Sequence, residues 1–154
     1  MASSPPDGSK ALQKRTAGIL VVIVSGLVFV AAVGLIDWAE LPKLVRAGGT
    51  ISIVSHGATL WDFKGHHAGV LTVIAVGTVA FAAVGLLSDS VITALPAVCG
   101  SFYLLGQTVP IGAGYIGYRA GFWLATAAAL ATSIGGVLAV AGAASFAKPS
   151  EAAE

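Results

Sequence analysis

The sequence predicts an all-α membrane protein, folded as an antiparallel four-helix transmembrane bundle. Its 154 residues are 56% hydrophobic and 10% charged, and its mean hydropathy is +0.91. Soluble domains carry about 25% charged residues, so this composition excludes that class. Four apolar runs follow one another along the chain, each near the length of about 20 residues that a helix needs to cross a bilayer. A net charge of +1 gives no reason to expect a nucleic-acid partner.

The chain opens with a polar, proline-containing stretch, residues 1–16, which is expected to be a disordered cytoplasmic tail. The first span is predicted at residues 17–36, which carry no charge and one polar side chain, Ser25. In lipid such a run must be helical, because every backbone polar group needs a partner within the segment. The cations ahead of it suggest a secretory signal peptide. However, the run exceeds the usual apolar core of about 7–15 residues and lacks an A-x-A site, which favours a retained span.

The remaining spans are predicted at residues 68–87, 91–111 and 120–144, and residues 145–154 are expected to be a second disordered tail. Only Ser88, Asp89 and Ser90 separate spans two and three, so these spans should be antiparallel neighbours. Cations are equally numerous on the two sides. Because the first span usually sets the orientation, the sequence predicts a multi-pass plasma-membrane protein with cytoplasmic N- and C-termini.

The link between spans one and two, residues 37–67, is the one connection long enough for structure of its own, and we expect a small extracytoplasmic module there. Asp37 and Glu40 have the spacing of a helix start, and Pro42 suits a first turn. These residues predict a short helix that ends before two glycines. Residues 50–55 and 58–63 have strand-like composition and flank His56-Gly57, which predicts a β-hairpin about that dipeptide.

Small residues recur at seven-residue spacing in three of the spans, a period that keeps one stripe facing a neighbouring helix in a left-handed bundle. The predicted packing positions are Gly18, Ser25, Ala32, Ala68, Ala75, Ala82, Gly121, Ala128 and Gly135, with Gly142 continuing the last stripe. In lipid, helices associate by such close packing rather than by a hydrophobic drive. The stripes therefore predict the surfaces on which the helices meet.

Aromatic residues cluster near the ends of the spans, where an interface belt is expected. Its predicted members are Trp38, Trp61, Tyr115, Tyr118 and Trp123. The segment "GAGYIG", residues 112–117, satisfies the G-x-G-x-x-G pattern of dinucleotide sites. It follows an apolar span rather than a strand, and no acidic residue comes after it until Glu151. This context does not fit a nucleotide site.

All three histidines lie just before the second span, within "SHGATLWDFKGHH". His56, His66, His67 and Asp62 are the candidate metal ligands of this stretch. Zinc sites need three or four converging ligands, but adjacent histidines in a strand point to opposite faces and His56 lies at the far end of the predicted hairpin. We interpret the histidines as polar caps at the hydrated edge of span two, and we expect no metal.

No Asp, Glu, Lys, Arg or His lies inside the four predicted spans. Ionisable residues at membrane depth mark proton relays and ion paths, and haem-binding bundles need facing histidines. No serine is set in a nucleophile elbow, and Cys99 is a lone cysteine in an apolar run. The sequence therefore predicts a protein that is not an enzyme and holds no cofactor.

Two stretches, "IDWAELPKLVRAGG" and "YRAGFWLATAAALA", together with the Ala/Gly/Val-rich spans, resemble small four-span envelope proteins of mycobacteria and other actinobacteria. The layout is also similar to that of claudin-type proteins, but the paired loop cysteines of that family are missing. The actinobacterial resemblance implies an accessory subunit of a large envelope machine, first of all a Mce-type lipid importer, or else of the respiratory supercomplex.

Three hypotheses about function follow. The first is an accessory or scaffolding subunit whose partners are other integral membrane proteins and lipids. The second is a small carrier for an uncharged or lipidic substrate, with Gln107 and Thr108 lining its path. The third is a metal-dependent envelope protein that uses the histidine stretch.

Overall fold

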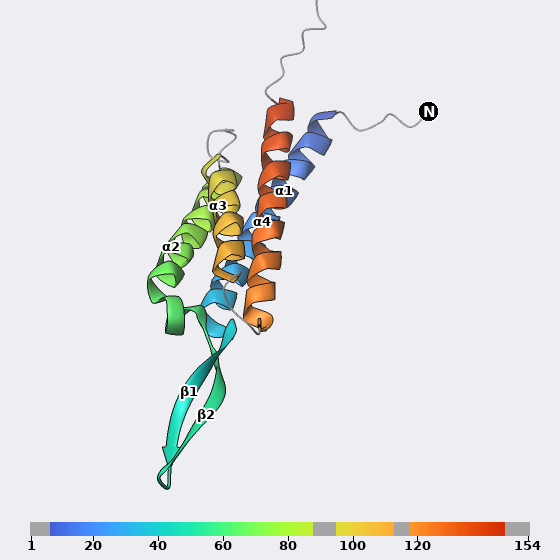
Figure 1. Cartoon of the computed structure of the whole chain (residues 1–154). Coiled ribbons are helices and arrows are strands. Elements are labelled where there is room, and N and C mark those ends of the chain that lie inside the picture. Colours follow the sequence, from blue (N-terminus) through green and yellow to red (C-terminus); the bar gives the residue numbers. More distant parts are fainter. Residues whose placement is uncertain (1–6, 88–94, 113–117, 147–154) are drawn as a thin grey trace, which may run out of the picture.

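The computed structural model describes residues 7–87, 95–112 and 118–146, and it consists of four helices and one β-hairpin (Figure 1). The helices are α1 (Asp7–Leu35), α2 (Leu60–Leu87), α3 (Leu95–Gly112) and α4 (Ala120–Phe146). The strands β1 (Ala39–Ala47) and β2 (Thr50–Ala58) lie between α1 and α2 and pair in an antiparallel two-stranded sheet.

The helices lie side by side, so that each packs against the next in the order α1, α2, α3, α4, and α4 closes back on α1 with the most extensive contact. The hairpin extends from one end of this bundle, while the start of α1 and the end of α4 lie at the other end (Figure 1). The mostly helical architecture with one two-stranded antiparallel sheet agrees in part with the fold class predicted from the sequence.

Three of the described helices are long and apolar enough to cross a membrane, over Ser9–Leu35, Lys64–Leu87 and Ala120–Ala144. The 18 residues of α3 would reach about 27 Å at 1.5 Å per residue, and this helix is not among the three. The composition of α3 explains the difference, since Gln107, Thr108 and Pro110 interrupt its apolar run. The structure thus supports a helical membrane protein with three clear spans.

The contact between α1 and α4 brings backbone against backbone. A Cβ placed on Gly18 would come within 2.5 Å of the amide nitrogen of Ala139 and 2.6 Å of the carbonyl oxygen of Gly135. Further along the same contact, the Ser25 hydroxyl of α1 lies 2.7 Å from the Thr132 hydroxyl of α4, and both are buried. Interhelical hydrogen bonds of this kind and close approach at small residues are the main sources of helix association in lipid.

The predicted packing positions are all buried in the described structure. Ala32, Ala68 and Ala75 have no exposed surface. The other buried members of the set are Gly18, Ser25, Ala82, Gly121, Ala128 and Gly135. In the described structure these small residues therefore lie on the inward sides of α1, α2 and α4.

The predicted disordered tail 1–16 is wrong for its second half, because α1 begins at Asp7; residues 1–6 lie outside the described part. The reason is a tertiary contact. Arg15 is only 7% exposed and its Nη2 donates a hydrogen bond of 2.6 Å to the carbonyl oxygen of Gly85. That carbonyl belongs to the last turn of α2, where backbone oxygens lack helical partners and cations are favoured. On the other tail, α4 continues to Phe146.

The predicted short helix before the two glycines is also wrong, since residues 39–47 form β1. The hairpin turns at Gly48 and Gly49, with φ of 58° and 85°, rather than at His56-Gly57. Two successive positive φ angles are what a two-residue hairpin turn of the I′ type requires, and glycine adopts them without steric cost. Gly-Gly is therefore the stronger turn signal, and it places the turn eight residues nearer the N-terminus than His56-Gly57.

With the turn at Gly48-Gly49, the predicted second strand over residues 58–63 cannot form. Only Ala58 belongs to β2, and α2 begins at Leu60. The Thr59 side chain and the Asp62 carboxylate bond to each other at this start, an arrangement related to the capping box. Non-helical angles at Lys64 (φ −138°, ψ 43°) then kink α2 before its membrane-length part.

We expect Gly18→Ala to destabilise the bundle by about 1–3 kcal/mol, the usual range for overpacking, because the added methyl group would overlap the α4 backbone. Unfolding in detergent, followed by circular dichroism, measures the effect. Gly77→Ala is the matched control, since a Cβ at Gly77 on α2 meets no atom within 4 Å. Equal stability of the two variants would contradict the close contact between α1 and α4.

Candidate functional site

The hairpin is the part of the molecule that is least covered by the rest of the chain. It projects beyond the ends of the helices (Figure 1), and every residue from Pro42 to His56 is exposed. Leu44, Ile51 and Ile53 are 71%, 64% and 72% exposed. Apolar side chains in such a position are the usual sign of a protein or membrane contact.

Strand pairing sorts these side chains onto two faces, because successive residues of a strand point to opposite sides. Leu44 pairs with Ile53, and Arg46 with Ile51. These residues, together with Pro42 and its partner Ser55, make up one face, which we call the apolar hairpin face. The opposite face alternates apolar with polar residues and is formed by Leu41, Lys43, Val45, Ser52, Val54 and His56.

The base of the hairpin is anchored inside the bundle. Ala39 and Ala58 pair across the strands and are buried, and Trp38 just before them is 2% exposed. The indole Nε1 of Trp38 donates a hydrogen bond of 2.7 Å to the carbonyl oxygen of Ala32 in the last turn of α1. Trp38 was predicted to lie in the interface belt; in the structure it is buried, caps α1, whose terminal carbonyls need partners, and packs edge-on against Phe122.

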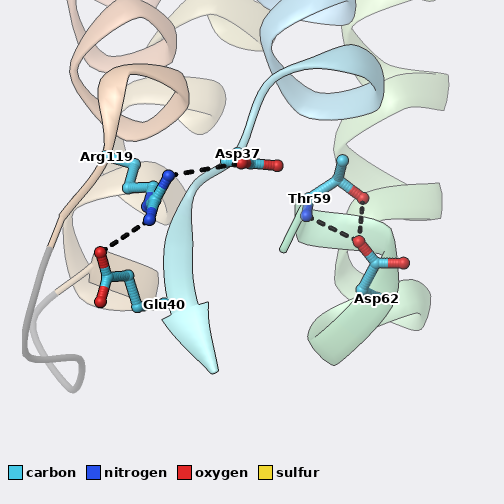
Figure 2. Close-up of polar contacts among 5 residues, drawn as sticks. All are labelled: Asp37, Glu40, Thr59, Asp62 and Arg119. Carbon is cyan, nitrogen blue, oxygen red and sulfur yellow. Dashed lines mark hydrogen bonds and ion pairs between the residues drawn. The ribbon is translucent and has the colours of Figure 1, made fainter. Parts of the chain in front are cut away.

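Arg119 connects the segment before α4 to the segment after α1 (Figure 2). Its Nη2 donates to Glu40 Oε1 at 2.7 Å, and its Nη1 lies 3.7 Å from Asp37 Oδ2. Backbone bonds reinforce the connection, from Arg119 N to the Trp38 carbonyl oxygen at 3.0 Å and from Gly121 N to the Asp37 carbonyl oxygen at 2.9 Å. Asp37 and Glu40 were predicted to start a helix, but here both bind one guanidinium. We call these contacts the Arg119 junction.

Two glycines make the junction possible by letting backbone segments approach. A Cβ on Gly121 would lie 2.7 Å from the carbonyl oxygens of both Ile36 and Asp37, and one on Gly57 would overlap the Asp37 carboxylate. A shallow groove of about 550 Å³ runs beside Asp37 and Arg119. The charges at its wall are already paired, so the junction serves as a structural link rather than as an open anion site.

Asp62 belongs to the start of α2 (Figure 2). Its Oδ2 accepts hydrogen bonds from Thr59 N at 2.7 Å and from Thr59 Oγ1 at 2.8 Å. These bonds favour the charged carboxylate and lower the pKa of Asp62 below its ordinary 3.8, with His56 adding a smaller effect of the same sign. A carboxylate in the first turn also interacts favourably with the helix dipole. Asp62 thus has a structural role rather than the oxygen-ligand role considered from the sequence.

The candidate metal ligands are spread along the structure. His56 lies on β2, whereas His66 and His67 are exposed on α2 with ring centroids 6.0 Å apart. Within the described ranges, no group of three or more His, Cys, Asp or Glu residues is arranged to hold a metal ion.

The other predicted belt residues lie at the hairpin end of the bundle. Trp61, Tyr118 and Trp123 are exposed, while Tyr115 lies outside the described residues. Tyr118 stacks on Phe122 at 4.5 Å, and Trp123 contacts both rings edge-on. Together with Trp38 these rings form a continuous aromatic cluster beside the Arg119 junction.

The sequence did not predict the roles of Arg119 and Trp38 at the hairpin end of the bundle, or that of Arg15 at the opposite end. A signal existed for Arg119, because it is the lone cation just before the last span and faces a loop that begins with two carboxylates. The roles of Arg15 and Trp38 depend on carbonyl groups that only the folded chain brings near.

Comparison of the chain with protein-family models, with curated proteins and with solved structures finds no match. The functional reading of this site therefore depends on its geometry and chemistry.

We expect a double-mutant cycle of Arg119→Gln and Glu40→Gln to give a coupling energy of about 0.2–1 kcal/mol. This is the range for ion pairs that are partly open to solvent, and the two side chains are 41% and 44% exposed. Stability of the four proteins in detergent measures the coupling. An additive result would show that this pair does not hold the hairpin base.

Asp62 should make the start of α2 sensitive to acid. Because its pKa is lowered in the folded state, its stabilising contribution is present above the ordinary pKa and is lost as the pH falls through the lower folded value. Hydrogen exchange of the amides at the start of α2 should therefore quicken, relative to a reference peptide, in that acidic range. Asp62→Asn should abolish this pH dependence, and a persisting transition in the variant would assign it to another group.

Proposed function

We propose that the protein is a non-catalytic accessory or scaffolding subunit of a larger membrane complex. The observation that carries the proposal is the apolar hairpin face, which stands clear of the bundle with Leu44 and Ile53 each more than 70% exposed. Isolated two-stranded hairpins are marginally stable in water. Covering this face with a partner removes apolar area from water, which stabilises the assembly by roughly 25 cal/mol per Å² before the costs of association.

The membrane topology that we propose has four spans, with α3 as the additional one. Its support is the packing of α3 between α2 and α4, and its hydroxyl groups are satisfied within the helix, as shown by Thr108 Oγ1 donating to the Leu104 carbonyl oxygen at 2.6 Å. With cytoplasmic N- and C-termini in a plasma membrane, as the first span suggests, the hairpin is extracytoplasmic.

The partner we propose is another integral membrane protein with an extracytoplasmic acidic surface. Lys43 and Arg46 are the two full charges between Leu41 and Ala58, and no carboxylate is present in that stretch. The opposite charge would speed and orient docking. The resemblance of the two stretches quoted above supports a Mce-type lipid importer as the complex.

The test is a pull-down of the tagged full chain from its own cells in mild detergent, with partners quantified by mass spectrometry. Leu44→Thr/Ile53→Thr should reduce recovery of stoichiometric partners about tenfold or more, since losing interface anchors costs more than about 1 kcal/mol. Threonine keeps the strand propensity, so the hairpin should remain folded.

The matched control is Val45→Thr/Val54→Thr, which removes apolar surface from the opposite face of the same hairpin and should leave recovery nearly unchanged. Recovery of a homo-oligomer alone from the unmodified chain would contradict a subunit role. Substrate transport by that homo-oligomer would instead favour the carrier.

A further inference from the structure

We propose that the kink of α2 forms a binding site for one anionic phospholipid, whose phosphate meets Lys64 and His66 and whose acyl chain lies in the groove below them. The proposal is independent of the subunit role, because it concerns the side of α2 that faces lipid rather than the hairpin. Its basis is an apolar groove that His66 lines, with Lys64 and His67 close to it in the chain where the membrane-length part of the helix begins.

Three bases fall within four residues at the start of the membrane-length segment Lys64–Leu87: Lys64, His66 and His67. Both histidines are exposed and Lys64 is half-buried. Within the described ranges Lys64, His66 and His67 form no ion pair, and the nearby carboxylate of Asp62 is bonded to Thr59. The positive end of this site is therefore available to an external anion.

The groove on α2 measures about 450 Å³ and is lined by Gly65, His66, Gly69, Val70, Val73 and Ile74. Residues four apart lie on one face of a helix, so the two glycines and Val73 follow one line along α2 away from the bases. A Cβ on Gly65 would meet nothing within 4 Å, whereas one on Gly69 would lie 3.6 Å from the ring of Trp61. Trp61 thus borders the groove, and the missing side chains leave its floor open.

The two features together select the occupant. An apolar groove at membrane depth takes a hydrocarbon chain, and bases at the hydrocarbon boundary favour an acidic headgroup; basic pockets beside spans bind anionic lipids for this reason. Trp61 lies at the same level, where amphipathic rings sit among headgroups. A zwitterionic lipid would fill the groove but would gain less from the bases.

The experiment uses the purified full chain in nanodiscs of phosphatidylcholine with a minor fraction of phosphatidylglycerol, and lipids retained on the protein after mild detergent extraction are counted by native mass spectrometry. We expect phosphatidylglycerol to be enriched about fivefold or more over its share in the nanodisc, the size of effect that one or two cations near a membrane give.

Two variants separate the parts of the site. Lys64→Gln/His66→Gln should remove the preference for phosphatidylglycerol and leave a lipid bound. Gly65→Leu should reduce retention of both lipids, because a Cβ at Gly65 meets no atom within 4 Å and the longer side chain would occupy the groove. Lys43→Gln/His56→Gln removes the same two side-chain types from the hairpin and should leave both the retention of lipid and the preference for phosphatidylglycerol unchanged.

The proposal is overturned if phosphatidylglycerol is not enriched on the unmodified protein, or if the hairpin control loses as much of the preference as Lys64→Gln/His66→Gln does. Release of the lipid by millimolar inorganic phosphate would also overturn it, since that result would mean a headgroup site without the groove. Circular dichroism of each variant identifies any that fail to fold, and for those the enrichment is measured with Lys64→Gln alone. Loss of the proposed partner complex has no bearing on these outcomes.

Discussion

Direct approach of the α1 and α4 backbones is the constraint on which the rest of the structure depends. In lipid no hydrophobic force drives helices together, so association relies on close packing and hydrogen bonds. The contact is made at both ends and between them by Gly121, Gly18 and Gly142, each of which leaves no room for a Cβ. A side chain at any of these positions would separate the helices and loosen the groups that their approach brings together.

Those groups supply hydrogen-bond partners to the unpaired backbone groups at the helix ends. The last carbonyls and first amides of a helix have no partner within it, and in a membrane protein such groups are costly to bury unbonded. At one end of the bundle, the Trp38 indole bonds to the Ala32 carbonyl oxygen of α1 and the Gly121 amide bonds to the Asp37 carbonyl oxygen. At the other end, Arg15 bonds to the Gly85 carbonyl oxygen of α2. Helix capping thus depends on helix packing, because each cap is supplied by a segment that the packing brings near.

How far the sequence predicts this architecture depends on whether a feature is local. Seven-residue spacing of small residues is a local pattern, because helix geometry alone puts such residues on one face, and Ala68 and Ala75 are buried in the structure. The hairpin was predicted in the right loop but about the wrong turn, since His56-Gly57 and Gly48-Gly49 both contain glycine. The two positive φ angles of the turn decide between them, because a histidine pays a steric cost there that glycine does not.

Longer-range contacts gave no such local signal. The pairing of Arg119 with Glu40 spans 79 positions of the chain, and the burial of Trp38 requires α1 and α4 to be in place first. A tryptophan near a span end is typical of an interface belt, so composition alone gave no sign that Trp38 is buried against α1 and α4. Arg15, likewise, precedes an apolar run as the cations of a tail do, and only the end of α2 explains why it is buried.

The contrast between the base and the distal part of the hairpin bears on how a partner could use it. The base is held by Ala39, Ala58 and the Arg119 junction. Because an isolated hairpin is only marginally stable, these contacts with the bundle fix the direction of the strands. Toward the turn, Pro42 has no N–H to offer, and prolines and cations on an outer strand discourage further pairing. β1 carries Lys43 and Arg46 as well, whereas β2 has neither proline nor a full charge. A partner that added a strand would therefore meet β2, while a partner that packed on a side would meet Leu44 and Ile53. Either way the rigid base supplies orientation and the exposed apolar residues supply the contact.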